Sequence, residues 1–74
     1  MPKASIRNRI RTLREAAGLT QTDLAARCHC TRQTIIVLEQ ERYVPSLSLA
    51  FHIARAFGVK IEDVFELDPA QSEP

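Results

Sequence analysis

The chain has 74 residues, only two glycines and 5% aromatic residues, which together favour a single all-α domain. At this size a lone hydrophobic core supplies about 3–5 kcal/mol, so a partner subunit would add useful stability. No apolar run approaches the roughly 18 residues of a membrane span, and no apolar segment follows the charged N-terminus as it would in a secretory signal. We therefore expect a cytoplasmic protein without a membrane partner.

The net charge of +1 conceals an uneven distribution of charge. Residues 1–60 hold all ten Lys and Arg but only four acids, whereas residues 61–74 hold five acids and no base. A basic body can face phosphates while an acidic end stays away from them. An ordinary solvated surface explains the same distribution equally well.

Residues 1–5 have the composition of a flexible lead-in, and the first helix is expected from about Ser5 to Ala17. Four apolar residues recur there at intervals of four, three and four, which makes one stripe: Ile6, Ile10, Leu13 and Ala17. Gly18 then ends the helix, at a position where a left-handed backbone suits glycine.

Two short helices with a tight turn between them are expected at about 21–28 and 31–39. Thr20 can cap the first, with Asp23 at the third helical position in a capping-box-like arrangement, and Thr31 can cap the second. The inner faces carry apolar residues at helical spacing: Leu24, Ala25 and Cys28, then Ile35 and Leu38.

A fourth helix is expected after Ser46, which is a natural cap, and Gly58 closes it. Its inner stripe is expected to be Leu47, Ala50, Ala54 and Phe57, with Ile53 beside them. A short fifth helix should lie near Glu62 to Phe65, with Val64 and Phe65 packed inward, and residues 69–74 read as a disordered tail. The predicted fold is thus a compact five-helix bundle over residues 6–68.

The stretch from Thr20 to Glu39, TQTDLAARCHCTRQTIIVLE, resembles the helix-turn-helix of the Cro/repressor-type (XRE-like) family of bacterial and phage transcription regulators. The matching residues are Gln21, Leu24, Ala25, Cys30, the run from Thr31 to Ile35, Leu38 and Glu39. Further matches are Leu13-Arg14, Gly18-Leu19-Thr20, Arg42-Tyr43-x-Pro45-Ser46-Leu47, Ile53-Ala54-x-x-Phe57-Gly58-Val59 and Ile61-Glu62-Asp63-Val64-Phe65. Each motif alone is common, but the ordered set spans about residues 6–66.

The resemblance implies a lambda-repressor-like fold that binds double-stranded DNA through the third helix. A major groove admits one α-helix, and the side chains near that helix's N-terminus reach the base edges. Steps of about 100° per residue place Gln33 and Val37 opposite the buried face. Base contacts are therefore expected from Arg32, Gln33, Thr34 and Val37. By resemblance, phosphate contacts are expected from Gln21, Thr31, Arg42 and Tyr43.

The resemblance further implies an ion pair between Arg14 and Glu39, which would join the first helix to the end of the third. We expect a homodimer that binds an inverted-repeat operator as a repressor, because a single short helix covers too few base pairs for a specific site. The segment from Val64 to Leu67 is the first choice of dimer surface, and Phe51 on the fourth helix is the second. No cofactor and no small-molecule ligand are expected, and the protein would associate with the bacterial nucleoid or with phage DNA.

Three positions depart from the family pattern. Ile36 and Val37 place two adjacent apolar residues where one or both should be exposed, and they could contact thymine methyls or form a contact surface for a protein. His29 replaces the glycine that is usual in the turn, where His tolerates a left-handed backbone better than most residues. Gln40-Glu41 stands where Asn-Gly is common, so the shape of that loop is open.

Other functions find less support in the sequence. Cys28-His29-Cys30 invites a metal or redox site, but zinc ligands are usually spaced by two to four residues, so we interpret both cysteines as small buried hydrophobes and expect no metal. The chain has no Gly-rich phosphate loop and no nucleophile paired with a base, so we do not expect an enzyme. The alternatives are an antitoxin-like or mobile-element regulator that acts with a protein partner, and a protein-interaction module that does not bind DNA.

Overall fold

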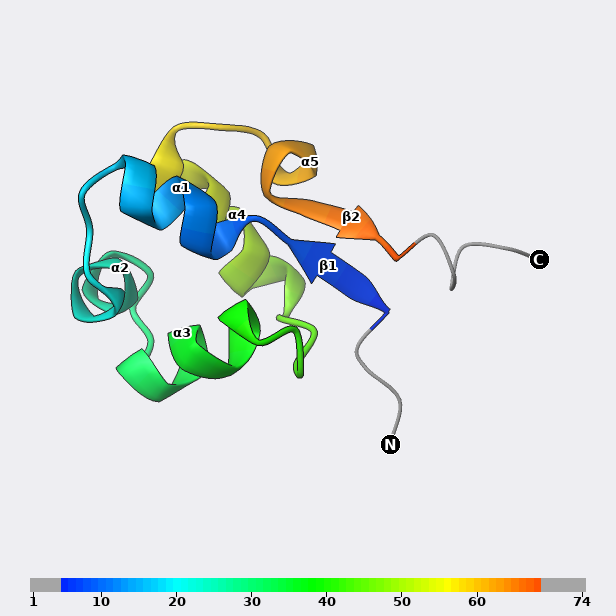
Figure 1. Cartoon of the computed structure of the whole chain (residues 1–74), viewed down its shortest axis with the longest axis horizontal. Coiled ribbons are helices and arrows are strands. Elements are labelled where there is room, and N and C mark those ends of the chain that lie inside the picture. The colour runs from blue at the N-terminus through cyan, green and yellow to red at the C-terminus, as the bar shows by residue number, and fades with distance from the viewer. Residues whose placement is uncertain (1–4, 69–74) are drawn as a thin grey trace.

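The computed structural model describes residues 5–68, and within that range it contains five helices and two short strands. The helices are α1 (Ile10–Ala16), α2 (Gln21–Arg27), α3 (Arg32–Glu39), α4 (Leu47–Phe57) and α5 (Ile61–Val64). The strands β1 (Ile6–Asn8) and β2 (Phe65–Leu67) form a small antiparallel sheet. The helices gather into a bundle, and the sheet extends from one side of it (Figure 1).

Every helix contributes to the hydrophobic core. The fully buried large side chains are Ile10 from α1, Leu24 from α2, Ile35 and Leu38 from α3, Ile53 from α4 and Val64 from α5. Removing such side chains from water is the main favourable term in folding. The predicted all-α five-helix fold is confirmed, with the two-stranded sheet as an addition. None of the helices within residues 5–68 is both long and apolar enough to cross a bilayer.

The helix starts follow from interactions between residues that are close in sequence. The Thr20 hydroxyl accepts a hydrogen bond from the Asp23 backbone N–H, and the Asp23 carboxylate accepts one from the Thr20 N–H, each at 3.0 Å. This is the capping box that the sequence predicts. The hydroxyls of Thr31 and Ser46 likewise accept from the N–H three residues later, at 3.2 and 3.1 Å. These contacts place α2, α3 and α4 close to their predicted boundaries.

Four helices are followed within two residues by a residue with a left-handed backbone. These residues are Gly18 (φ 72°), His29 (φ 59°), Glu41 (φ 59°) and Gly58 (φ 69°). After each of these helices, the N–H of the next residue donates to a carbonyl in the last turn, in the pairs Leu19–Arg14, Cys30–Ala25, Arg42–Val37 and Val59–Ala54. This is the Schellman arrangement, which usually carries glycine at its left-handed position. The expected left-handed backbone at His29 is confirmed, and the loop after α3 keeps the same form with Glu41 at the glycine position.

The prediction of a first helix from about Ser5 is wrong. Residues 6–8 form β1, which pairs with β2 in the register Ile6 to Leu67 and Asn8 to Phe65. The Asn8 side chain accepts a hydrogen bond from the Ile10 N–H at 3.1 Å, at the point where the strand gives way to α1. Ile6 lies four residues before Ile10, which fits a helical stripe, but its strand partner is at the other end of the chain. Ala17 also falls outside the core, because it is exposed beyond the end of α1.

The orientation of one side chain and the end of one helix also differ from expectation. The spacing of Leu47 predicts a place on the inner stripe of α4, but Leu47 is 71% exposed, while Ala50, Ile53 and Ala54 are buried. Helical spacing sets the angular position of a residue, but it does not determine whether a neighbouring element covers it. The fifth helix ends at Val64 rather than near Phe65, because Phe65 enters β2. The expected tail at 69–74 and all but Ser5 of the expected lead-in lie outside the described residues.

Candidate nucleic-acid interface

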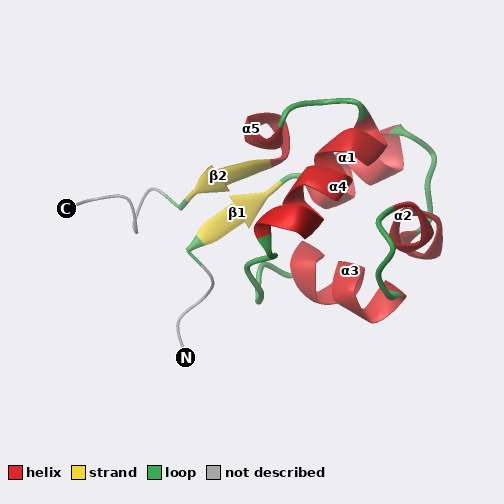
Figure 2. Ribbon diagram, turned by 180° about the vertical axis from the view of Figure 1, so that it is seen from behind, coloured by secondary structure: helices red, strands yellow, loops and turns green. Residues whose placement is uncertain are grey.

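The first turn of α3 presents two polar side chains to solvent. Ile35 and Leu38 are fully buried and so fix the inner face of the helix. Arg32 and Gln33 are exposed, and neither forms a hydrogen bond or ion pair with any other residue in the described part of the chain. Seen from behind, α3 lies beside α2 at the rim of the bundle (Figure 2). These two side chains are therefore available to an external partner.

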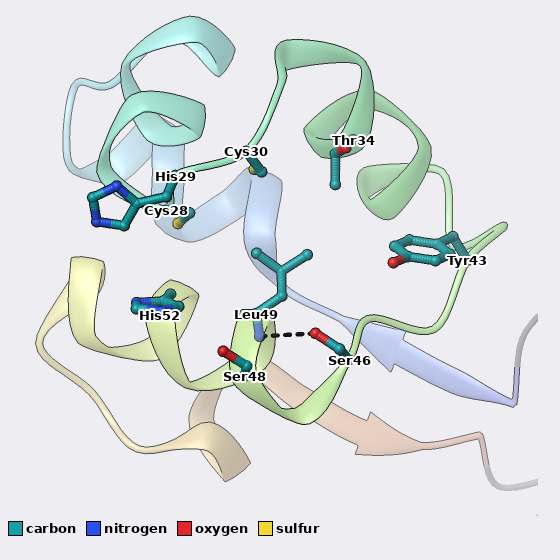
Figure 3. Close-up of a pocket in the computed structure, with 9 residues that line it drawn as sticks. All are labelled: Cys28, His29, Cys30, Thr34, Tyr43, Ser46, Ser48, Leu49 and His52. Atoms are coloured by element: carbon teal, nitrogen blue, oxygen red, sulfur yellow. Dashed lines mark hydrogen bonds between the residues drawn. The ribbon is translucent and has the colours of Figure 1, made fainter.

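Thr31, Thr34 and Val37 are less open than Arg32 and Gln33. The Thr31 hydroxyl caps α3 and lies 3.1 Å from the Thr34 hydroxyl. Thr34 is half-buried, and its side chain points into a hollow between α3 and α4 (Figure 3). Val37 is also half-buried. Thr34 thus turns toward α4, and Val37, one turn beyond Gln33 on α3, is less open to solvent than Gln33.

An ion pair joins the end of α3 to α1. Arg14 Nε donates to Glu39 Oε2 at 2.7 Å, and Arg14 Nη2 donates to Glu39 Oε1 at 3.3 Å. Arg14 Nη1 also donates to the Leu19 carbonyl at 3.0 Å. The two charged side chains are only 12% and 7% exposed. The hydrogen bond with Glu39 raises the pKa of Arg14 above its ordinary value, so Arg14 stays charged in this pair at neutral pH.

Gln21 joins the same cluster. Its side-chain amide donates to Glu39 Oε1 at 3.2 Å, so one of its two N–H groups is engaged within the protein. Glu39 therefore connects α1, α2 and the end of α3 through one carboxylate.

The loop after α3 carries two further candidate residues. Arg42 is exposed and has no side-chain partner in the described part of the chain. Tyr43 is 43% exposed, and its ring lies at one end of the hollow between α3 and α4, near Ser46 (Figure 3). Arg32 and Gln33 on α3 and Arg42 in the following loop are thus all exposed and open to a partner.

The hollow itself has a volume of about 380 Å³ and reaches from Tyr43 to the turn before α3. At that end the rings of His29 and His52 meet edge to face, with centroids 5.6 Å apart. Cys28 is 2% exposed, and burial raises the pKa of its thiol to about 11, so it stays protonated at neutral pH. Cys30 packs against the core. Among residues 5–68 no three or more potential ligands lie close enough to hold a metal ion.

A helix-turn-helix family profile matches residues 10–64, from the start of α1 to the end of α5. The chain belongs to the helix-turn-helix family. This membership confirms the resemblance to the Cro/repressor-type regulators, and the family is one of transcription regulators rather than enzymes.

Relatives of this helix-turn-helix chain include archaeal and phage proteins. It is 52% identical over 60 residues to an uncharacterized HTH-type transcriptional regulator of Methanocaldococcus jannaschii, covering 81% of this chain and 91% of the relative. An uncharacterized HTH-type transcriptional regulator of Methanothermobacter thermautotrophicus is 58% identical over 64 residues, covering 85% and 93%. The immunity repressor protein of Bacillus phage phi105 is 32% identical over 60 residues, covering 81% and 42%.

Solved structures share the same fold. The crystal structure of a putative DNA-binding protein from Bacteroides fragilis superposes with a TM-score of 0.74 at 21% identity, covering 82% of this chain and 98% of that one. The hypothetical transcription factor NHTF from Neisseria superposes with a TM-score of 0.68 at 30% identity, covering 73% and 62%.

Sequence reasoning missed three side chains that hold the ends of α3 in place: Asn8, Glu41 and His52. Helical spacing places Asn8 inside the first helix, and Glu41 stands out only as a departure from the family pattern. No local signal connects His52 with His29, because they lie on different elements.

Proposed function

We propose that this helix-turn-helix transcription regulator is a repressor that reads a specific sequence in duplex DNA, with α3 as its recognition helix. The observation that carries the proposal is the exposed and unpaired state of Arg32 and Gln33 on a helix whose other face is buried. A major groove admits an α-helix, and residues at the helix N-terminus reach base edges. A side chain with no role inside the protein can bind a base without loss of a native contact.

The chemistry of the two side chains suits base recognition. Arginine can donate two hydrogen bonds to guanine, and glutamine can form two with adenine. Val37, one turn beyond Gln33, would contact a thymine methyl, and Thr34 would add a flanking contact. Both are half-buried, so we expect them to contribute less than Arg32 and Gln33.

Selection from a pool of random duplex DNA with the purified protein tests this function directly. We expect an enriched sequence with guanine or adenine at the positions facing Arg32 and Gln33, arranged as an inverted repeat. Recovery of the starting pool without enrichment would contradict sequence-specific binding and favour a protein-interaction module.

Phosphate contacts are proposed for Arg42, Tyr43, Thr31 and Gln21. Arg42 is exposed beside the C-terminal end of α3, and Thr31 is exposed at its N-terminal end. Gln21 keeps one N–H of its amide free of Glu39, and that group can reach a phosphate oxygen. Such contacts position the protein on the duplex but do not read sequence.

Replacing Arg42 with alanine should weaken binding to all duplex sequences alike. A plot of log K against log salt concentration has a negative slope. Each lost phosphate contact makes this slope less steep by about 0.9, because one fewer counterion is released. The slope is measured by titrating a labelled duplex at several salt concentrations. Arg11→Ala is the matched control, because Arg11 is exposed on α1 and paired with Glu15. An Arg42→Ala slope equal to that of the wild type would remove Arg42 from the interface.

We further propose that the protein binds DNA as a homodimer through one face of α4 and α5. Of the segment expected to form the dimer surface, Val64 and Phe65 are buried in the protein's own core, and Leu67 is 61% exposed. Phe51, the second choice, is 52% exposed, and Leu47 near it on α4 is 71% exposed. Monomeric proteins rarely leave contiguous apolar patches of this kind open to water.

Two hollows shape this face. One, of about 240 Å³, is lined by Leu47, Ala50 and Phe65 among others. The other, of about 450 Å³, is lined by Phe51, Ala54 and Val59 among others, and both include Ile61. Apolar side chains that project beside open apolar hollows allow a second copy to pack by mutual insertion, which is one form of the self-complementary contact that a twofold axis requires. Two recognition helices would then read half-sites about one helical turn apart.

Replacing Leu47 with glutamate should convert the dimer to a monomer. The change places a charge at the centre of the proposed interface, while the side chain is exposed in a single copy and so leaves the core intact. Sedimentation equilibrium should show a dissociation constant raised by more than about tenfold, with an unchanged melting temperature for the monomer. Thr12→Glu, on the exposed surface of α1, is the control. A Leu47→Glu protein that stays dimeric would exclude this face.

A further inference from the structure

The two ends of α3 have an unusual composition. The other left-handed helix ends in the described residues are glycines, Gly18 and Gly58, whereas α3 is preceded by His29 and followed by Glu41 at the same kind of position. A left-handed backbone is disfavoured for a residue with a Cβ and costs glycine little. Where a residue other than glycine adopts this backbone, we expect its side chain to make a contact that offsets the cost.

Glu41 makes such a contact with β1. Its Oε2 accepts a hydrogen bond from the Asn8 backbone N–H at 2.9 Å. The sheet explains why this N–H is available. On the β1 side, the bonds to the β2 segment fall on odd-numbered residues, since Arg9 N donates to the Val64 carbonyl and the Ser5 carbonyl accepts from the Asp68 N–H. Successive residues of a strand point their N–H groups in opposite directions, so that of Asn8 points away from β2.

The Asn8 side chain ties the same strand to the last turn of α3. Its Nδ2 donates to the Leu38 carbonyl at 2.8 Å, and its Oδ1 accepts from the Ile10 N–H at 3.1 Å. The Leu38 carbonyl also accepts from the Glu41 N–H at 2.9 Å. The Glu41 side chain therefore binds the backbone of β1, and the Asn8 side chain binds the backbone at the end of α3. These two contacts together link β1 to the end of α3.

The opposite end of α3 is held in a different way. His29 contacts His52 of α4 through an edge-to-face ring contact, and within residues 5–68 its side chain forms no hydrogen bond (Figure 3). An exposed ring contact of this kind is less directional than a pair of hydrogen bonds. His29 therefore serves as a comparison in which the same backbone penalty occurs without the link to the sheet.

We propose that Glu41, together with Asn8, is a positioning residue that sets the angle of the recognition helix relative to the β1–β2 sheet. The sheet carries Ile6 and Phe65, which line a hollow of the proposed dimer face together with Leu47. The angle of α3 relative to the sheet therefore determines how far apart the two recognition helices lie in a dimer. The Asn8–Glu41 link would thus set the spacing between half-sites that the protein accepts. This inference rests on the proposed function, since it assumes that a dimer binds an inverted repeat.

A glycine at position 41 separates this role from simple stabilisation. Glu41→Gly removes the carboxylate and also the energetic cost of a left-handed backbone at a residue with a Cβ. If Glu41 served only to stabilise the fold, the loss and the gain would offset each other, and stability and DNA binding would change little. We expect instead that discrimination against sites with one base pair added to or removed from the spacer falls by about tenfold, because one hydrogen bond is lost in each copy. Binding to an isolated half-site should change by less than about twofold.

Three further variants complete the test. Glu41→Gln keeps an acceptor for the Asn8 N–H and should retain the spacing preference. His29→Gly removes the same backbone penalty at the other end and should also retain it. Asn8→Asp keeps the acceptor for Ile10 but replaces the donor to Leu38 with a carboxylate, and should lose the preference as Glu41→Gly does. Wild-type spacing preference in either Glu41→Gly or Asn8→Asp, or equal losses on half-sites and full sites, would overturn the proposal.

A measurement without DNA distinguishes failure of this inference from failure of the proposed function. Amide hydrogen exchange at Asn8 should be about tenfold faster in Glu41→Gly than in the wild type and in Glu41→Gln. If the wild type ignored duplex DNA, the proposed function would fail, and the exchange rates would still decide whether the link holds β1 to α3. Unchanged exchange at Asn8 in Glu41→Gly would show that the link does not.

Discussion

Alanine in place of Gln33 or Arg32 should weaken binding to the preferred site by about 1–3 kcal/mol for each recognition helix. In a dimer on an inverted repeat each substitution acts twice, so the total loss is expected to reach about 2–6 kcal/mol. Each substitution should also reduce the difference in affinity between the preferred base pair and other base pairs at the position that the side chain faces. Neither side chain has a partner among the described residues, so the melting temperature should not change.

Competition binding with duplexes that differ at single base pairs measures this effect. Gln40→Ala is a matched control, because Gln40 is an exposed glutamine at the far end of the same helix. It should leave both affinity and preference at wild-type values. A Gln33→Ala protein with the preference of the wild type would show that α3 does not read bases through Gln33, and the same result for Arg32→Ala would leave the proposed interface without its main contacts.

Replacing Glu39 with alanine should destabilise the fold by about 3 kcal/mol, at the lower end of the range for breaking a buried pair by removal of one partner. Arg14 would keep only the Leu19 carbonyl as a partner while remaining charged and mostly buried. Gln21 would lose its acceptor at the same time. A lone core of this size supplies only about 3–5 kcal/mol, so about 0–2 kcal/mol would remain and from a few per cent to about half of the variant should be unfolded at room temperature.

Urea denaturation followed by circular dichroism measures the change in the free energy of unfolding. Glu39→Gln keeps an oxygen acceptor for Arg14 without the charge and should lose less than Glu39→Ala. Arg11→Ala breaks the exposed Arg11–Glu15 pair, and its effect should stay below about 0.5 kcal/mol. An unchanged unfolding midpoint in Glu39→Ala would mean that the ion pair contributes nothing to the fold.

Features that depend on neighbouring residues could be predicted from the sequence. Thr20, Thr31 and Ser46 cap their helices through a backbone N–H three residues away, so the cap and its partner occur in one short motif. The inner faces of α2 and α3 follow from helical spacing, and Leu24, Ile35 and Leu38 are all fully buried. Because helical spacing fixes these faces, it also places Gln33 opposite the buried side of α3, whereas Arg32 falls on a flank by the same spacing.

The remaining features depend on residues that meet only when the chain folds. Ile6 fits a helical stripe as well as a strand, and its pairing with Leu67 decides between them. Leu47 has the spacing of a core residue, but no neighbouring element in the described part of the chain covers it. Asn8 and Glu41 carry no motif at all, and their hydrogen bonds connect segments 33 positions apart. Helix ends and helix faces are local properties of this sequence, whereas the strand pairing and the placement of α3 against β1 arise from long-range contacts that no local pattern encodes.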